Sequence, residues 1–225
     1  MKRIRFVHLA LAALVAALAV PAAGVSKSTA VPTTIGKGEG KLTLIAWEGY
    51  TEKQWVAPFE KQTGCKVTAK YAGSSNDMFN LMTSGGGGEY DMVSASGDAS
   101  LRLIYAGALA EVNVKLIPAY KDFFKAFQSP SNNTVDGKHY GVSLQFGPNV
   151  LMYNTKSFPK KPTSWGAIYD PRNKGKITIP DNPIQIADAA LYLSKTKPSL
   201  GIKDPYELTK AQLDAAVQLL SLIHI

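Results

Sequence analysis

The sequence contains a single cysteine among 225 residues, so no disulfide can form within the chain. Cys65 alternates with Val67, Ala69 and Tyr71, which is typical of a strand in which the thiol is simply a small apolar side chain. Small exported domains often rely on disulfides when their core is thin. A chain without one has to be held together by a packed hydrophobic core.

Histidine is almost as scarce, with three residues in the whole chain. His8 lies in an apolar leader and His224 near the C-terminus, and His139 has no second histidine or cysteine at metal-ligand spacing. The sequence therefore predicts no metal and no cofactor. It also lacks a Gly-x-Ser-x-Gly nucleophile motif, and the glycines at 85–88 are not followed by the Gly-Lys-Ser/Thr of a phosphate loop. We expect a protein that is not an enzyme.

Dense runs of basic residues are missing as well, and the pair Lys160-Lys161 is the densest group. The chain carries 25 Lys and Arg against 17 Asp and Glu, a formal charge of +8. Lys2, Arg3 and Arg5 belong to the leader, so 22 basic residues remain against 17 acidic ones, or +5. This modest, scattered surplus predicts no nucleic-acid partner.

The long apolar run from Leu9 to Val20 follows those basic residues and precedes the small residues Pro21-Ala22-Ala23-Gly24. This layout is typical of a secretory signal peptide, which we place at residues 1–24. A retained membrane anchor is the alternative, although the run is shorter than the roughly 20 residues needed to span a bilayer. No cysteine follows the run, so a lipid anchor is not expected.

A flexible, polar lead-in at 25–40 precedes three repeats of strand and helix. Strands are expected at 42–47, 65–72 and 91–95, because these runs are apolar or alternate with period two. Helices are expected after each strand, ending at Gly64, Gly85 and Gly107 respectively, with Ser75 as a possible cap of the second. Such βαβ units predict a parallel sheet.

Later in the chain, further strands are expected at 139–146, 149–155 and 176–180, with a helix after the last. The sequence therefore predicts an α/β protein with two lobes. The first lobe is expected at 41–148 and the start of the second at 149–219, with a ligand cleft between them.

The ends of the first strands carry side chains that suit a ligand, since ligands bind beyond the carboxyl ends of parallel strands. Trp47 and Tyr50 follow the first strand, Ser75 the second, and Ser96 and Asp98 the third. A helix cap is the simpler explanation of Ser75 or Asp98, but not of the two aromatic residues. Aromatic rings near a carboxylate suit a cationic or amine-bearing ligand.

Five segments together resemble a known family in their order and spacing: LIAWEGY, FEKQTGCKV, EYDMVSASGDASLRLI, GPNVLMYNTKSFP and TSWGAIYDPRNKGKI. They are similar to the extracellular solute-binding proteins of spermidine/putrescine-type ABC transporters, particularly to members carrying SGDASLRL and IADAAL. The resemblance implies a two-lobed periplasmic-binding-protein fold of type 2, closing around its ligand by a hinge. It also implies a periplasmic monomer that delivers its ligand to permease subunits in the inner membrane.

The resemblance assigns roles to several residues in the first lobe. Trp47 and Tyr50 match aromatic residues that line the bound amine, and Ser96 matches a pocket serine. Asp98 stands where a polyamine-binding relative has a pocket tyrosine. In this chain, the position therefore offers a carboxylate.

The second lobe departs from the family pattern. Two carboxylates that pair with an ammonium group in the family fall on Asn182 and Gln185 here, with Asp181 adjacent. A dication would then depend on Asp98, Glu48 or Asp181 for its negative partner. A different solute, such as an amino acid or a monoamine, is the alternative.

Other classes of protein stay open at this point. The chain could be an exported hydrolase using Ser96 or Asp98, or a structural protein associated with a surface polymer. The resemblance also implies that the family continues beyond this sequence, so we expect a C-terminally truncated chain. The final residues 220–225, LSLIHI, resemble a translated sequencing adaptor, with a genuine apolar helix end as the alternative.

Overall fold

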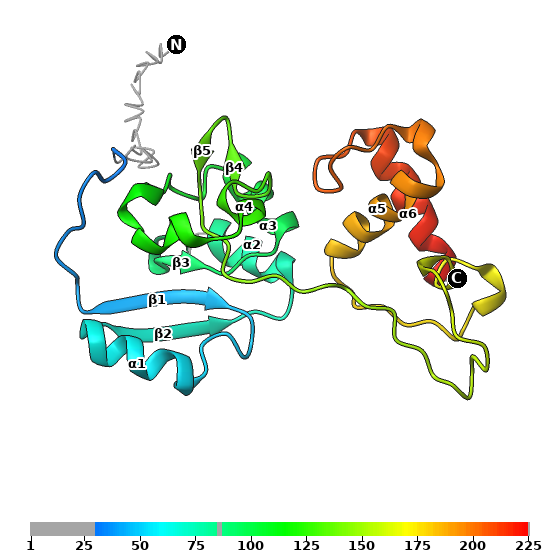
Figure 1. Cartoon of the computed structure of the whole chain (residues 1–225), viewed down its shortest axis with the longest axis horizontal. Helices are drawn as coiled ribbons and strands as arrows, with labels where there is room; N and C mark the ends of the chain where they lie inside the picture. The colour runs from blue at the N-terminus through cyan, green and yellow to red at the C-terminus, as the bar shows by residue number, and fades with distance from the viewer. Residues whose placement is uncertain (1–29, 85–86, 225) are drawn as a thin grey trace, which may run out of the picture. The chain divides into compact units, whose positions relative to one another are not determined.

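The computed structural model describes residues 30–84 and 87–224 (Figure 1). The predicted signal peptide lies outside these residues. Residues 30–40, which belong to the expected lead-in, contain neither helix nor strand. In the part of the chain that is described, no helix combines the length and the apolar character needed to cross a membrane.

Strands and helices alternate in the N-terminal half, and helices dominate the C-terminal part. The elements are β1 (Lys41–Ala46), α1 (Lys53–Thr63), β2 (Lys66–Tyr71), α2 (Ser75–Thr83), β3 (Met92–Val93), α3 (Gly97–Tyr105), α4 (Lys125–Gln128), β4 (Thr134–Val135), β5 (Lys138–His139), α5 (Ile184–Thr196) and α6 (Lys210–His224). Short 3-10 helices cover Gly87–Glu89, Val114–Leu116, Pro118–Asp122, Trp165–Ala167, Pro171–Asn173 and Pro198–Leu200.

The main sheet has three strands in the order β2-β1-β3, and both pairings are parallel. Lys41 pairs with Lys66 and Leu44 with Met92, so the carboxyl ends of the three strands lie at one edge. Helix α1 lies alongside β2 (Figure 1). The predicted parallel sheet of βαβ units is confirmed.

Glycine ends α1 as expected, because Gly64 has a left-handed backbone (φ 72°) and its N–H donates to Glu60 O over 2.8 Å. The helix runs through Pro58, which lacks the N–H for one intrahelical hydrogen bond. Helix α2 differs from the prediction at its N-terminus, and the predicted stop at Gly85 lies outside the described residues. Ser74 is its N-cap, accepting a hydrogen bond from Asp77 N over 3.1 Å, and Ser84 is its C-cap.

One hydrophobic core cluster joins the sheet to α2 and α3. Its buried members are Ile45 from β1, Met78 and Met82 from α2, Leu103 from α3, and Ala72. Half-buried residues pack against it, among them Trp47 and Val93. The same cluster therefore packs the end of β1 against α2 and α3.

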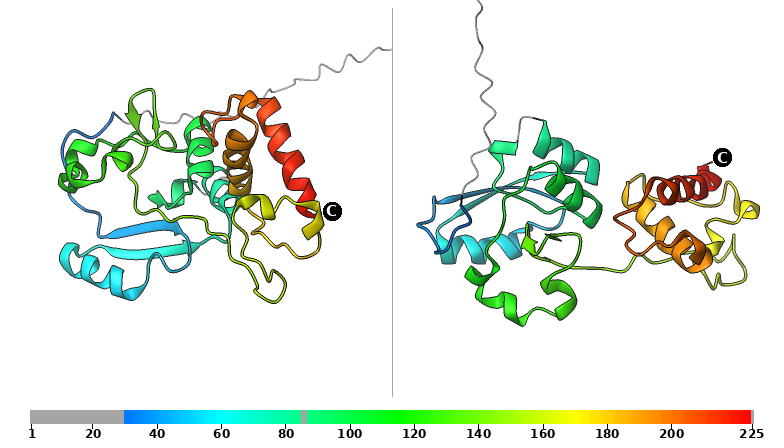
Figure 2. Two further views of the ribbon diagram at one scale, coloured as in Figure 1. Left: turned by 45° about the vertical axis from the view of Figure 1, so that its right-hand side comes forward. Right: turned by 90° about the horizontal axis from the view of Figure 1, so that it is seen from above.

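A second core cluster lies in the C-terminal part, where α5 and α6 pack side by side (Figure 2). Ala189, Ala190 and Leu193 of α5 and Ala216 of α6 are buried together with Ile168 and Tyr169. Leu220 and Ile223, from the end of the chain that resembles an adaptor, pack against this cluster as part of α6.

The strands expected at 139–146, 149–155 and 176–180 are wrong, apart from His139 in the two-residue strand β5. Strand β5 pairs with β4 in antiparallel orientation. Within the described residues, no neighbouring strand is hydrogen-bonded to 140–155 or 176–180. An extended segment becomes a strand only when its backbone forms hydrogen bonds with a neighbouring strand. The apolar pattern of these segments was therefore not sufficient to predict strands.

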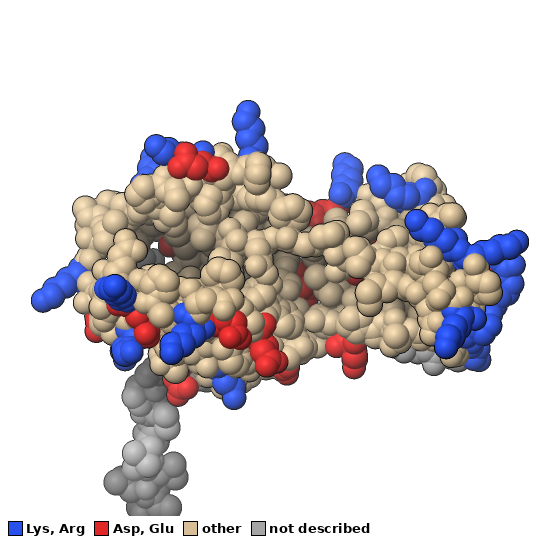
Figure 3. Space-filling model, turned by 60° about the horizontal axis from the view of Figure 1, so that its bottom comes forward, with Lys and Arg blue, Asp and Glu red and all other residues tan. Residues whose placement is uncertain are grey.

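Basic side chains are dispersed over the face shown in Figure 3 and are densest at its right-hand end. Between Lys156 and Lys176 the chain carries six exposed basic residues and one acidic residue, Asp170. Hydrogen bonds from Arg172 hold the pKa of the Asp170 carboxyl at about 2. This acid therefore stays ionised and belongs to a local surface pair.

Candidate ligand-binding site

Asp98 lies in the first turn of α3 and is half-buried. Its Oδ1 accepts a hydrogen bond from the hydroxyl of Ser75 over 3.2 Å. Its Oδ2 is buried and has no hydrogen-bond partner among the described residues. Burial raises the pKa of Asp98, although the Ser75 hydroxyl, the N–H groups of Asp98 and Ala99, and the charge of Arg102 act in the opposite direction.

The partner hydroxyl of Ser75 is itself completely buried, at the first position of α2. Ser75 was expected as a possible helix cap, and that interpretation is wrong because Ser74 caps α2. This shift of one residue points the Ser75 hydroxyl at α3. The segments that follow β2 and β3, the two strands on either side of β1, thus contribute to one polar contact.

Ser96 is the N-cap residue of α3, but its hydroxyl makes no capping hydrogen bond. Its carbonyl oxygen accepts from Ser100 N over 2.9 Å and from Ser100 Oγ over 3.0 Å. The half-buried hydroxyl of Ser96 is therefore not needed to begin the helix.

Trp47 and Tyr50 follow β1 in a turn, in which Tyr50 N donates to Trp47 O over 3.2 Å. Gly49 within this turn has φ 89°, a left-handed conformation that favours glycine. Both aromatic side chains are half-buried, and Trp47 packs against the core cluster that includes Leu103 of α3. The indole and α3 therefore share one core.

The predicted residues of the second lobe lie at the start of α5. Asn182 Oδ1 accepts from Ile184 N over 3.2 Å, and Asn182 O accepts from Gln185 N over 3.0 Å. Asp181 is exposed and Gln185 is half-buried. Among the described residues, no hydrogen bond joins these three residues to Asp98, although α3 and α5 are in contact.

Sequence reasoning missed Asp188, which lies one turn after Gln185 in α5. Asp188 is half-buried and accepts hydrogen bonds from Asn149 Nδ2 at 3.0 Å and 2.8 Å. Burial raises the pKa of its carboxyl, while the Asn149 hydrogen bond lowers it. A signal was available, because Asp188 is the lone carboxylate in a helical segment whose alanines 187, 189 and 190 are all buried.

Tyr206 was missed as well, and it lies in a loop that offers no sequence signal. Its ring contacts the backbone of Gly97, the residue before Asp98. Burial first, and then the charges of Asp98, Asp188 and Asp204, raise the pKa of its hydroxyl. The ring therefore lies in the electrostatic reach of both half-buried carboxylates.

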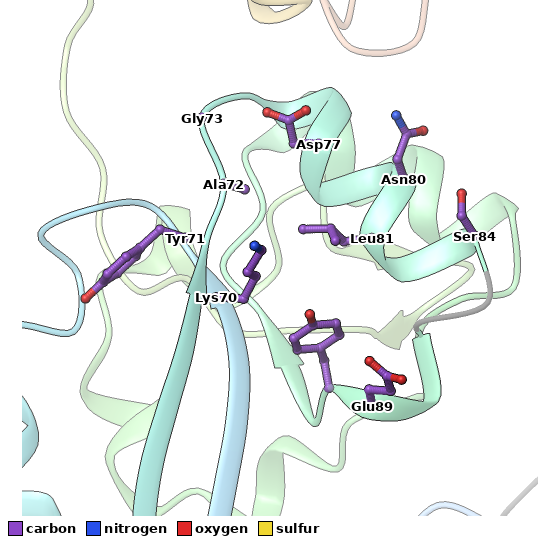
Figure 4. A pocket seen from close by; sticks show the side chains of 10 residues that line it. Lys70, Tyr71, Ala72, Gly73, Asp77, Asn80, Leu81, Ser84 and Glu89 are labelled. Carbon is purple, nitrogen blue, oxygen red and sulfur yellow. The ribbon is translucent and has the colours of Figure 1, made fainter.

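The structure also contains an open cavity of about 470 Å³ beside the end of β2 and one face of α2 (Figure 4). Lys70, Asp77, Glu89 and Tyr90 are among its lining residues. None of the residues predicted from the sequence lines this cavity. The cavity and the predicted polar site thus lie in different places. We favour the site at Asp98, because its buried Oδ2 has no partner among the residues that the structure describes, and an unsatisfied buried acceptor is costly.

Comparison with known proteins connects this geometry to a family. Residues 54–223 match the family model of bacterial extracellular solute-binding proteins. A structure from Listeria monocytogenes, assigned to a spermidine/putrescine ABC transporter, is 25% identical, with a TM-score of 0.57. It matches over 81% of this chain and 54% of its own.

Two further structures share the fold. The TpPotD lipoprotein (Tp0655) of Treponema pallidum is 22% identical, with a TM-score of 0.56 over 80% of this chain and 54% of its own. The spermidine/putrescine ABC transporter substrate-binding protein PotD of Streptococcus pneumoniae is 18% identical, with a TM-score of 0.51 over 81% and 54%. The chain spans about half the length of these solved structures.

These likenesses confirm the predicted α/β class of the periplasmic binding proteins. The family model covers most of the chain, from the first helix of the sheet region to the last helix. The chain belongs to the family of bacterial extracellular solute-binding proteins.

Proposed function

We propose that the chain is part of the substrate-binding component of an ABC importer and captures a small amine-bearing, polyamine-like solute. The observation that carries this proposal is the buried Oδ2 of Asp98, which has no partner among the described residues. The family and the names of the similar structures support the transport role.

An ammonium group would complete the environment of Asp98. Leaving a buried acceptor unsatisfied costs about 1–3 kcal/mol, and hydrogen bonds to charged groups are among the stronger ones. An ammonium supplies both the missing donor and the compensating charge, whereas a neutral or anionic ligand lacks the charge. The half-buried rings of Trp47 and Tyr50 would provide faces for the cation.

The full proposed contact set follows from the sequence and comprises Trp47, Tyr50, Ser96, Asp98, Asp181, Asn182 and Gln185. In this set, Asp98 replaces the charge that the neutral Asn182 and Gln185 lack. Asp181 is exposed and can meet a second ammonium group only at a solvent-facing position. An amino acid or a monoamine is the second candidate ligand, because one half-buried carboxylate satisfies one ammonium group.

The cellular role follows from the same proposal. The protein would act in the periplasm as a monomer and deliver its solute to permease subunits in the inner membrane. A receptor of this kind returns its ligand unchanged. Release of a chemical product from any of the tested amines would instead support an exported hydrolase.

Calorimetric titration of the full chain with putrescine, spermidine and 4-aminobutyrate tests the proposal. We expect saturable binding of at least one diamine or polyamine, accompanied by a change in tryptophan fluorescence. Recovery of the intact ligand by mass spectrometry is expected after dissociation. Absence of binding for all three ligands would overturn the amine assignment.

A further inference from the structure

The loop residues Asp204, Tyr206 and Glu207, which precede α6, each contact a distant part of the chain. Asp204 Oδ2 accepts from Ser131 Oγ over 2.7 Å. Glu207 Oε1 accepts from the hydroxyl of Tyr105, in the last turn of α3, over 2.8 Å. The two hydrogen bonds fix this loop against α3 and against the turn that contains Ser131.

Tyr206 lies between these two anchors, with its ring against Gly97. A Cβ at position 97 would meet three ring atoms of Tyr206 at 2.9, 3.1 and 3.3 Å. Contacts shorter than about 3.0 Å require something to move, so a side chain at position 97 would displace the ring from this place. The requirement is spatial, since Gly97 is not among the glycines with positive φ.

The surroundings of Tyr206 suit a cation. The next residue after Gly97 is Asp98, whose Oδ2 lacks a partner among the described residues. Tyr206 is 36% exposed, so part of the residue remains open to solvent. An aromatic ring beside a carboxylate combines the two groups that bind ammonium ions most readily.

We propose that Tyr206 is a further ligand-contacting residue that helps to determine specificity for amines, held beside Asp98 by the hydrogen bonds of Asp204 and Glu207. This inference rests on the proposed amine site. The alternative is that Tyr206 is only a packing residue that attaches its loop to α3. The two roles differ in whether the aromatic face, rather than the bulk of the side chain, governs amine affinity.

Titration of the full chain with putrescine tests the inference, using Tyr206→Phe, Tyr206→Leu and Tyr206→Ala. Tyr206→Phe keeps the aromatic face, and we expect its affinity to stay within about threefold of the wild type. Tyr206→Leu keeps much of the bulk without a π face, and we expect a loss of roughly five- to thirtyfold, as for Tyr206→Ala. Thermal melts and circular dichroism would show whether each variant is folded.

Two further variants test how the ring of Tyr206 is held in place. Gly97→Ala should displace the ring and weaken putrescine binding to a similar degree, since its methyl group would collide with Tyr206. Tyr105→Phe removes one anchor and should weaken binding about two- to fivefold. Tyr120→Phe is the matched control, because this tyrosine contacts His139 rather than the loop, and it should bind as the wild type.

The outcomes separate this inference from the proposed function. Wild-type binding together with unchanged affinity in folded Tyr206→Leu and Tyr206→Ala overturns the role of Tyr206 and leaves the amine site standing. Failure of the wild type to bind any amine overturns both. Equal losses in Tyr206→Phe and Tyr206→Leu would assign the effect to the hydroxyl and would contradict a role for the aromatic face.

Discussion

The hydroxyl of Ser75, at the start of α2, donates a hydrogen bond to Oδ1 of Asp98, in the first turn of α3, over 3.2 Å. This contact holds one carboxylate oxygen and leaves the other buried without a partner among the described residues. A carboxylate placed only to cap a helix would not need a second helix to orient it.

Asp98→Asn in the full chain is expected to weaken binding of putrescine roughly ten- to a hundredfold. The substitution removes the charge but keeps the shape, and a hydrogen bond to a charged group contributes about 1.5–3 kcal/mol. Calorimetric titration of both proteins with putrescine, spermidine and 4-aminobutyrate measures the difference.

Asp77→Asn is a suitable control for that substitution, because Asp77 is an exposed carboxylate in the first turn of α2. We expect it to leave amine affinity unchanged. If Asp98→Asn binds as tightly as the wild type, Asp98 serves only the helix, since Asn and Asp cap helices about equally well.

Amine affinity is expected to fall as the pH is lowered from neutral into the acidic range. The free protein has an Asp98 whose pKa is raised, chiefly by burial, so its carboxylate takes up a proton earlier than an exposed one. Protonated Asp98 cannot pair with an ammonium ion, and the amine itself stays charged across this range. The pH dependence should disappear in Asp98→Asn, and an unchanged slope in that variant would assign the titration to another group.

Without ligand, Asp98→Asn is expected to melt at a slightly higher temperature than the wild type at neutral pH, by roughly 1–2 °C. A carboxyl whose pKa is raised in the folded state contributes stability below its unfolded value, here 3.8, and this contribution is lost as the pH rises through the folded pKa. The ionised, half-buried form is therefore unfavourable at pH 7. Melting curves at neutral and acidic pH should show the difference shrinking in acid; a lower melting temperature in Asp98→Asn at pH 7 would contradict this.

Leu103→Ala is expected to destabilise the sheet region by about 2–5 kcal/mol. Leu103 is fully buried among Ile45, Met78 and Met82, so the shorter side chain leaves a cavity. Urea unfolding followed by circular dichroism measures the change. Leu144→Ala, at a position that is 71% exposed, should cost little and is the matched control.

Residues 25–219 expressed alone are expected to be poorly soluble. The unpaired segment after β5 exposes Leu144, Phe146, Val150 and Met152, and contiguous apolar surface favours association. Replacing Leu144 and Met152 with serine should raise the soluble yield while changing the melting temperature little. A sharp, cooperative melt of a monomer without these changes would refute the expectation.

The sequence alone determined the order of β1, α1, β2, α2, β3 and α3 and the parallel pairing of the strands. These elements follow one another closely along the chain. Each has a local sequence signal of its own: an apolar run, a helical period or a glycine at its end. Gly64 shows the physical basis, since its left-handed backbone closes α1 wherever the rest of the chain lies. The aromatic turn at Trp47 and Tyr50 and the position of Asp98 at the start of α3 were likewise readable from local pattern.

Only the tertiary structure decided which extended segments became strands and which polar groups met. Residues 140–155 have the composition of strands. Whether they form one depends on backbone hydrogen bonds to a neighbouring strand, which the local sequence does not specify. The contact of Tyr206 with Gly97 and the bond between Tyr105 and Glu207, which are 102 residues apart, arise from packing rather than pattern. The burial of the Asp98 Oδ2, which has no partner in the described part of the chain, has the same origin, because burial and hydrogen bonding are set by residues that come together only when the chain folds.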